Sequence, residues 1–297
     1  MSDVVLIVNP AAGKGAAASA AARAALRLRE RGIAVRVHQT TSAEDTTDAA
    51  HDAALHGARA VVACGGDGTI NRVLQPLVGT DVPLGILPLG TGDDNARLLQ
   101  IPRGQVELAA DVVIAGATRT VDVALVRTED GTERYFLGVL STGFDSDVNE
   151  VANEMTRFSG TTKYIAAMLK RLRTFAPIPY EFTIDGVLHQ QDAVLFSIGN
   201  GKSYGGGMNV TANAEPDDGE LDAVWLDAVS LATLLRVFPM VYSGKHLARK
   251  EVHEARGRSF SVSAPGQVAY ADGERIGELP ITVRVVPSAL HVLTPGR

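Results

Sequence analysis

The chain lacks the features of secreted and membrane-spanning proteins. Its 297 residues include one cysteine, Cys64, which excludes an intrachain disulfide and, within an apolar stretch, predicts a buried thiol in a reducing compartment. No apolar run approaches the roughly 20 residues that a membrane-spanning helix needs. The chain also lacks a charged first segment followed by an apolar stretch and a small-residue cleavage site. We therefore expect a cytoplasmic protein.

Positive charge is outweighed by negative charge. Lysine and arginine number 28 against 34 aspartates and glutamates, which gives a net charge of −6 at pH 7. This balance argues against nucleic acid as a partner, because phosphate backbones attract basic surfaces. A chain of 297 residues is long enough to build two hydrophobic cores.

The chain divides near residue 122. Before that point strand-like and helix-like segments alternate, which predicts an α/β domain with a parallel sheet and helices on both faces. After it strands dominate and Asp-Gly turns recur, which predicts a mostly antiparallel β-sandwich over residues 123–286. The expected strands are 4–8, 33–38, 60–64, 84–87, 120–127, 134–140, 180–184, 193–198, 221–226, 259–263, 281–286 and 290–293. The expected helices are 16–31, 43–55, 70–78, 105–115, 162–174 and 231–246.

The most informative motif is the run G-G-D-G-T at residues 65–69, which joins a strand to a helix. Its three glycines let the backbone turn sharply and bring N–H groups close to an anion, and the helix start adds a partial positive charge. A carboxylate repels phosphate, so Asp67 indicates contact with a metal ion, a hydroxyl or a ribose. Such turns are also common structural elements, and one alone is a weak signal.

Polar loops follow two further strands. Residues 9–15, with the sequence N-P-A-A-G-K-G, match neither the P-loop nor the dinucleotide fingerprint. Residues 89–97 contain Asp93 and Asp94, one of which is expected to cap the next helix. Ligands of open α/β sheets bind at the carboxyl ends of strands, so these loops are candidates for a binding site. The late pair Asp272-Gly273 is expected to form a hairpin turn.

In order and spacing, the motifs resemble those of the lipid-kinase family that contains bacterial diacylglycerol kinases, sphingosine kinases and ceramide kinases. That family carries N-P-x-x-G, G-G-D-G-T, G-T-x-N-D and a late D-G-E, which correspond here to residues 9–13, 65–69, 90–94 and 272–274. The resemblance spans nearly the whole chain. It implies an NAD-kinase/phosphofructokinase-like first domain over residues 1–122 and an ATP-dependent lipid kinase. Diacylglycerol is the default acceptor, and phosphatidic acid is then the product.

The resemblance also implies a set of nucleotide-binding residues at the strand ends. They are Asn9, Pro10, Ala11, Ala12, Gly13, Thr40, Gly66, Asp67, Gly68, Thr69, Ile70, Asn71, Arg72, Thr91 and Asp94. Thr40 belongs to a T-T-S run that could equally cap the helix at residue 43. The resemblance makes Glu274 the general base, with Asp67 as its rival, while Asp67 and Asp94 organise Mg²⁺–ATP.

A second magnesium site is implied in the loop before residue 221. Asp218 matches a ligand of a structural magnesium, with the backbone carbonyls of Glu215 and Glu220 as its companions. Without the resemblance, this segment reads as a tight turn. The family also implies that the last strand, about residues 287–297, returns to the first domain, and that the protein can form a homodimer.

Three residues in or beside the motifs of the first domain depart from the family pattern, and Ala212 replaces a proline later in the chain. Asp93 replaces an asparagine, Asn95 replaces an aromatic residue or leucine, and Arg72 replaces a glutamate. Because Asp67 and Glu274 are retained, together with the acid of the third motif, an active kinase is still expected.

Other functions stay open. An NAD kinase shares the G-G-D-G-T loop, but the late D-G-E and the G-T-x-x-D segment count against it. A sphingoid-base or other lipid kinase, and a silent nucleotide- or lipid-binding relative, are further alternatives. Residues 163–173 form a basic amphipathic pattern that could lie on anionic lipid at the inner face of the membrane or could pack on the core. No motif fixes segments such as 144–160 that are expected to shape the choice of acceptor.

Overall fold

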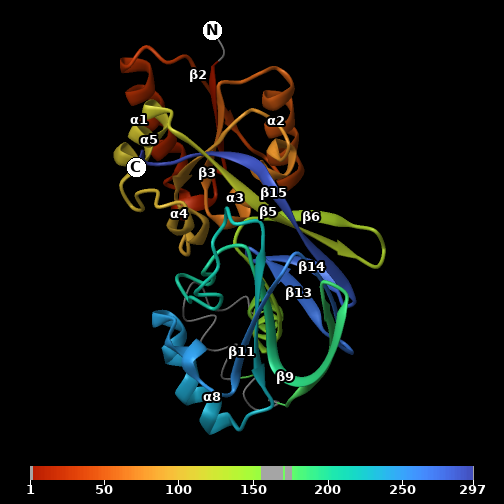
Figure 1. Cartoon of the computed structure of the whole chain (residues 1–297). Helices are drawn as coiled ribbons and strands as arrows, with labels where there is room; N and C mark the ends of the chain where they lie inside the picture. The colour runs from red at the N-terminus through yellow and green to blue at the C-terminus, as the bar shows by residue number, and fades with distance from the viewer. Residues whose placement is uncertain (1–2, 155–169, 171–175, 297) are drawn as a thin grey trace. The chain divides into compact units, whose positions relative to one another are not determined.

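A computed structural model describes residues 3–154, 170 and 176–296 (Figure 1). The helix expected at 162–174, with its basic face at 163–173, lies outside the described residues except for Lys170. The chain folds into two compact units. The first unit comprises Met1–Val123, Pro216–Asp218 and Val286–Arg297, and the second comprises Ala124–Glu215 and Gly219–Val285.

The first unit is built on a parallel sheet with the strand order β2-β1-β3-β4. Its strands are β1 (Val4–Val8), β2 (Val35–Gln39), β3 (Ala60–Gly65) and β4 (Leu84–Pro88). Every residue of β1, β3 and β4 is buried, as expected for parallel strands that helices cover on both faces. The end of β15 (Ile281–Leu293) runs parallel to β4, with Val292 opposite Leu84.

Helices cover both faces of this sheet. In Figure 1, α1 (Ala17–Glu30) and α5 (Val106–Ala115) lie on one face, and α2 (Ala43–Leu55) and α3 (Asp67–Leu74) lie on the other. The buried side of α1 consists mostly of alanine, which lets the helix approach the sheet closely. Arg27 and Asp111 join α1 to α5 through an ion pair of 2.7 Å. The short elements are η1 (Ala12–Gly15), η2 (Gln75–Leu77) and α4 (Asp94–Leu98).

The second unit is mainly antiparallel. Its strands follow the order β14-β13-β7-β9-β8-β12-β15, while β10 pairs with β9 and β11, and β5 pairs with β6. The strands are β5 (Thr118–Thr128), β6 (Glu133–Phe136), β7 (Val139–Gly143), β8 (Ile178–Ile184), β9 (Val187–Gly199), β10 (Leu221–Asp227), β11 (Val252–Gly257), β12 (Ser259–Ser263), β13 (Val268–Ala271) and β14 (Glu274–Glu278). The helical elements are α6 (Phe144–Glu154), α8 (Leu231–Val237), η4 (Phe238–Ser243) and η5 (Lys245–Ala248).

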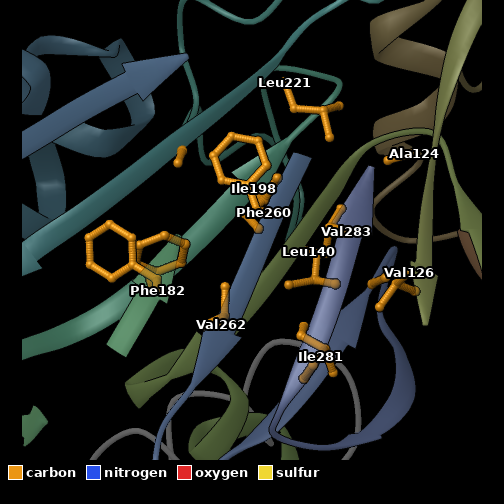
Figure 2. Close-up of a cluster of buried hydrophobic side chains, with 14 of the residues drawn as sticks. Ala124, Val126, Leu140, Phe182, Ile198, Leu221, Phe260, Val262, Ile281 and Val283 are labelled. Carbon is orange, nitrogen blue, oxygen red and sulfur yellow. The ribbon is translucent and has the colours of Figure 1, made fainter. Parts of the chain in front are cut away.

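The core of the second unit is a cluster of aliphatic and aromatic side chains that these strands share (Figure 2). Phe182 contributes from β8, Leu140 from β7, and Phe260 from β12. The rings of Phe182 and Phe196 lie 4.7 Å apart between their centroids, in a tilted contact. The predicted fold class, a parallel α/β domain followed by an antiparallel β-sandwich, is confirmed.

Several element boundaries differ from those predicted. The strand expected at 134–140 is interrupted, because the N–H groups of Leu137 and Gly138 turn aside to bond Asp272. The helix expected at 231–246 ends as α8 before Pro239 and continues as two 3₁₀ segments, as expected where proline removes a donor. The two strands expected at 281–286 and 290–293 are one strand, β15.

The prediction also omitted α6, β11, β13 and β14, although the Asp272-Gly273 turn between β13 and β14 was expected. In the described part of the chain, no helix is long and apolar enough to cross a bilayer.

Candidate active site

Three predicted motifs meet at one edge of the parallel sheet. They follow β1, β3 and β4, which are adjacent and share one direction, so their carboxyl ends lie side by side. The N–H of Asn9 donates to the carbonyl of Cys64 over 3.2 Å, and the N–H of Leu89 donates to that of Gly65 over 2.9 Å. These bonds hold the loops in register beyond the ends of the strands.

Asn9 connects the first loop to the second. Its Nδ2 donates to Oγ1 of Thr69 over 3.2 Å, while its Oδ1 accepts from the N–H of Ala11 over 3.0 Å. Both ends of the amide are therefore used, one for the 9–13 loop and one for the first turn of α3. Pro10, Ala11 and Gly13 are exposed beside it.

Thr40 lies next to this pair of loops. It is buried, and both its N–H and its Oγ1 donate to the carbonyl of Val8, over 2.9 and 3.3 Å. Capping of α2 falls to Ser42, whose hydroxyl accepts from the N–H of Asp45 over 3.1 Å. The expectation that the T-T-S run caps the helix is therefore confirmed for Ser42, while Thr40 itself does not cap and stays a candidate for binding.

Glycine is required where the second and third loops touch. A Cβ on Gly90 would lie 2.7 Å from Cα of Gly66, and a Cβ on Gly65 would collide with the side chain of Thr69. The backbones of the G-G-D-G-T and G-T-x-x-D loops are thus in direct contact. No side chain could stand between them without moving one loop.

Asp67 joins the starts of two helices. It is the first residue of α3, which begins three residues earlier than predicted, with Gly66 at the N-cap. Its two carboxylate oxygens accept from the N–H groups of Asp94 and Asn95, over 3.2 and 3.0 Å. Asp67 therefore satisfies donors at the first turn of α4 that would otherwise lack a partner.

The expectation that Asp93 or Asp94 caps this helix is wrong. Asp93 stands at the N-cap position with a φ of 48°, but its side chain makes no capping bond. Its Oδ1 instead accepts from the N–H of Gly90 over 2.8 Å and closes the loop on itself. The cap comes from Asp67, 27 residues away in sequence, and local spacing gives no sign of such a partner.

Several effects raise or lower the pKa values of the carboxyl groups at this edge of the sheet. Burial raises the pKa of Asp67, and the nearby charge of Asp94 adds to the rise, while the two backbone N–H groups act against it. Burial likewise raises the pKa of Asp93. Arg97 forms an ion pair with Asp94 within α4. The site thus concentrates negative charge beside two helix starts, an arrangement that attracts cations.

The remaining predicted residues of α3 point elsewhere. Ile70 and Asn71 have no exposed surface, and the carbonyl of Asn71 accepts from Nε2 of Gln75 over 2.8 Å. Arg72 is half-buried in the last turn, where its charge assists a backbone bond and Ser42 in lowering the pKa of Glu44. Within α3, only the first turn lies with the loops. Thr91 is exposed in the third loop.

Glu274 belongs to the second unit, at the start of β14 and opposite Ala271. The turn before it is formed by Asp272 and Gly273, with φ values of 49° and 82°, so the prediction of a turn at Asp272 is confirmed. The buried Asp272 carboxylate accepts from the N–H groups of Leu137 and Gly138, over 3.0 and 2.9 Å. The hairpin is therefore fixed to the neighbouring chain by its own turn residue.

Glu150 of α6 holds the same hairpin from another side, and sequence reasoning missed it. The hydroxyl of Tyr270 donates to its carboxylate, and Nε of Arg275 donates to it over 3.2 Å. The partners are 120 and 125 residues apart, and Glu150 belongs to no motif. The hairpin that carries Glu274 is thus attached at two places, through Asp272 and through Glu150.

In the loop at 215–220, the side chains of both glutamates take part in ion pairs. Lys202 binds the side chain of Glu215 at 2.6 Å, and Arg256 binds that of Glu220 at 3.3 Å. Glu215 and Glu220 can therefore contribute backbone carbonyls to a metal ion. Asp218 can contribute its carboxylate, which is exposed. Among the described residues no cluster of three or more acidic, histidine or cysteine side chains could hold a metal. This donor set suits Mg²⁺ that keeps several waters.

The chain matches two family descriptions. Residues 3–126 match the diacylglycerol kinase catalytic domain, and residues 138–294 match the YegS C-terminal NAD kinase beta sandwich-like domain. It is 40% identical over 296 residues to a diacylglycerol kinase of Mycobacterium tuberculosis, covering 99% of this chain and 96% of that protein. It is 30% identical over 280 residues to the lipid kinase YegS of Escherichia coli, covering 92% and 90%.

Solved structures agree on the fold. The crystal structure of a diacylglycerol kinase from Bacillus anthracis aligns with a TM-score of 0.74 at 20% identity, covering 99% of this chain and 97% of that one. The chain therefore belongs to the diacylglycerol kinase family of lipid kinases, which confirms the resemblance drawn from its motifs. It is a kinase, and ATP is the phosphate donor of that class.

Proposed function

We propose that this protein transfers the γ-phosphate of ATP to the hydroxyl of diacylglycerol and forms phosphatidic acid. The observation that carries the proposal is the bridge from Asp67 to the first turn of α4, which unites two kinase motifs in one site. The choice of diacylglycerol is supported by the 40% identical relative from Mycobacterium tuberculosis that bears that name.

The triphosphate is proposed to bind along the loops after β1, β3 and β4. The first turn of a helix leaves N–H groups without helical partners, and the helix dipole favours negative charge there. Residues 66–69 supply such a turn in α3, and the exposed loop at 9–13 borders it through Asn9. Thr40, Thr91 and Arg72 are the outer members of the proposed set, while Ile70 and Asn71 can contribute through their backbone alone.

Asp67 and Asp94 fit a magnesium ion that arrives with the nucleotide. Mg²⁺ prefers oxygen ligands and is commonly held by one or two carboxylates together with substrate phosphates. Asp67 and Asp94 supply those oxygens, and burial, together with the charge of Asp94, raises the pKa of Asp67. When bound, the ion neutralises charge on the phosphates. Asp218, with the carbonyls of Glu215 and Glu220, is proposed to hold the second, structural Mg²⁺.

Glu274 is proposed as the general base. A primary alcohol holds its proton tightly at neutral pH, so a carboxylate must accept that proton as oxygen bonds to phosphorus. The bond between the γ-phosphorus and the bridging oxygen breaks, and ADP leaves with the electron pair. Asp67 is the weaker candidate, because both of its oxygens already accept backbone N–H groups. Glu274 stands on an anchored hairpin, which suits a group that must keep its position.

Because the acceptor is a lipid, the enzyme is proposed to work at the inner face of the cytoplasmic membrane as a peripheral protein. A homodimer, as the family resemblance implies, remains a proposal that sedimentation analysis can test.

The test is transfer of labelled γ-phosphate in mixed micelles. The panel holds diacylglycerol, sphingosine, ceramide and phosphatidylglycerol, with NAD as the soluble acceptor. We expect label in diacylglycerol, lost in Glu274→Ala. Glu278→Ala is the matched control, because Glu278 is exposed in the same strand and is expected to leave the rate unchanged.

Label in NAD alone would make the protein an NAD kinase. Label in no acceptor, with ATP still bound, would overturn the diacylglycerol assignment. Full activity of Glu274→Ala would remove Glu274 as the base and leave Asp67 as the candidate.

A further inference from the structure

The segment 231–250 of the second unit comprises α8, η4 and η5, and α8 is labelled in Figure 1. This segment exposes large apolar side chains. Leu231, Leu235 and Tyr242 are 38%, 52% and 54% exposed. We call these three residues the outer stripe. Single exposed apolar residues are common on proteins, so the outer stripe has meaning only if its members are contiguous and not needed by the core.

A different face of the same segment packs against the hydrophobic core. Leu234 and Val237 of α8 are buried, and they pack in a cluster with strands β9, β10 and β11. The outer stripe has no part in that cluster. A helix that is apolar on both its buried and its exposed side is expected to have a further apolar surface to cover.

The outer stripe is contiguous. Leu231 and Leu235 are four residues apart in α8 and therefore lie one turn above the other. Phe238 follows three residues later, and its ring meets that of Tyr242 edge-on, with 6.4 Å between the centroids. The half-buried Phe238 thus connects Leu235 to Tyr242, and the outer stripe follows one line along α8 and η4.

Positive charge borders the row. Residues 231–250 include four lysines and arginines and no acid, although the whole chain has a net charge of −6. Arg249 pairs with Glu251 at 3.4 Å, and Lys250 also lies within the field of that acid. Arg236 and Lys245 are exposed, and in the described part of the chain neither forms an ion pair with a carboxylate.

We propose that the outer stripe, with Arg236 and Lys245, is the surface by which this protein docks on an anionic lipid bilayer. The inference rests on the proposed function, since a kinase of diacylglycerol must reach its substrate in a bilayer. Apolar and aromatic side chains on one side of an interfacial segment enter the boundary between head groups and acyl chains, and lysine and arginine at its border meet anionic head groups. The charge of this segment is opposite to that of the protein and complementary to that of the lipid.

The test is flotation of the full chain with vesicles of phosphatidylcholine, with and without phosphatidylglycerol. We expect Leu235→Ser/Tyr242→Ser to weaken binding to anionic vesicles by at least about tenfold, since two buried apolar contacts are lost. Arg236→Gln/Lys245→Gln is expected to weaken the same binding by about tenfold and to reduce its dependence on salt.

Matched controls come from the same unit. Val187→Ser/Leu188→Ser removes two apolar residues that are 61% and 57% exposed in β9, and Arg258→Gln/Arg284→Gln removes two exposed cations. Both are expected to bind vesicles like the wild type. Equal losses in controls and test variants, or none in the test variants, would overturn the proposal.

A second readout separates this inference from the proposed function. With a short-chain diacylglycerol dissolved as monomers, we expect the outer-stripe variants to keep the wild-type rate of transfer. With diacylglycerol embedded in vesicles, we expect their rate of transfer to fall by the same factor as their binding to vesicles. No transfer to either form by the wild type would refute the proposed function, while flotation would still report on docking. If the substitutions instead dissociate a dimer, as light scattering would show, without changing flotation, the outer stripe is a contact between copies and the membrane assignment is wrong.

Discussion

The Asp67 carboxylate caps a neighbouring helix and also lies in a buried acidic site. It accepts the N–H groups of Asp94 and Asn95, and it lies in a crowded acidic site where burial and the charge of Asp94 raise its pKa. The folded protein therefore holds the Asp67 proton more tightly than the unfolded chain does. Ionised Asp67 costs folding free energy at neutral pH, and this cost disappears as pH falls through the folded pKa toward the unfolded value.

Asp67→Asn tests this reasoning. Removing the charge is expected to lower transfer activity by at least about 100-fold. The difference in melting temperature, variant minus wild type, is expected to fall as pH goes from about 7 to about 4, because only the wild type recovers by protonation. Scanning fluorimetry of both proteins across that pH range measures the difference in melting temperature. A difference that stays constant with pH would show that Asp67 is not perturbed in the folded state.

Asn95 is the departure from the family pattern with the clearest physical cost. It is 2% exposed, and neither its Nδ2 nor its Oδ1 has a hydrogen-bond partner among the described residues. Asn95→Leu keeps the branching of the side chain and removes the unpaired polar atoms, so it is expected to stabilise the protein by about 1–3 kcal/mol. Urea unfolding gives the value.

Asn213→Leu is the control for that substitution. Asn213 is exposed, and its Nδ2 donates to the carboxylate of Glu254 over 3.0 Å, so no unpaired polar group is removed there. We expect no gain in stability. A gain of equal size at both positions would mean that leucine stabilises for a reason unrelated to buried polarity.

At the residue scale, motif reading found the loops but not their internal partners. The resemblance named Asn9, Asp67 and Thr69 through their motifs, and the structure joins all three in one network of loops. The capping bond of Asp67 and the attachment of the β13–β14 hairpin to Glu150 could not be predicted, because each joins distant segments without a local pattern. Burial of Ile70 and Asn71 follows from their place on the inner side of α3.

At the scale of elements, the contact between two loops depends on their glycines. A Cβ on Gly90 would lie 2.6 Å from Oδ1 of Asp93 and 2.7 Å from Cα of Gly66. Gly90→Ala is therefore expected to separate the loops, to destabilise the protein by about 1–3 kcal/mol and to weaken ATP binding. Calorimetric titration with ATP measures the second effect.

Gly296→Ala is the control for this prediction, since a Cβ at Gly296 would meet nothing within 4 Å. It is expected to leave both stability and ATP binding unchanged. Unaltered ATP binding in Gly90→Ala would show that contact between the loops is not needed for the nucleotide.

Element types were predicted better than element ends. The alternation of strands and helices specified the parallel sheet, and α2 has the predicted bounds, because Ser42 gives a clear capping signal. The short strands β13 and β14 were missed, although β12, which is equally short, was predicted with its exact bounds. The sequence of β14, E-R-I-G-E, is mostly charged and carries no strand-like apolar pattern. The split of residues 134–140 depends on Asp272, a tertiary partner that local pattern cannot include.

At the scale of the whole molecule, the first unit is discontinuous in sequence. It takes Met1–Val123, the short piece Pro216–Asp218 and Val286–Arg297. The last piece contributes Ala289, whose carbonyl accepts from the N–H of Gly79 over 2.7 Å, and Ser288, whose N–H donates to Asp122 over 2.6 Å. The sheet of the first unit is thus completed by residues from the end of the chain, since Val292 of β15 pairs with Leu84 of β4.

A chain that ends at Val285 is expected to lose ATP binding and to expose the first unit to proteolysis, because β4 loses its neighbour β15. Limited proteolysis with ATP titration measures both effects. A chain that ends at Thr294 keeps the paired residues and is the control. Normal ATP binding by the shorter chain would show that the first unit is complete without the end of β15.

The same discontinuity bears on how the protein is made. A ribosome releases the Asn9, Asp67 and Asp94 loops early in synthesis, yet the strand that flanks β4 is among the last segments to emerge. We expect the growing chain to have no stable nucleotide site until translation is almost finished. We therefore expect a half-made chain to consume no ATP, and a message cut short near its end to give an inactive product.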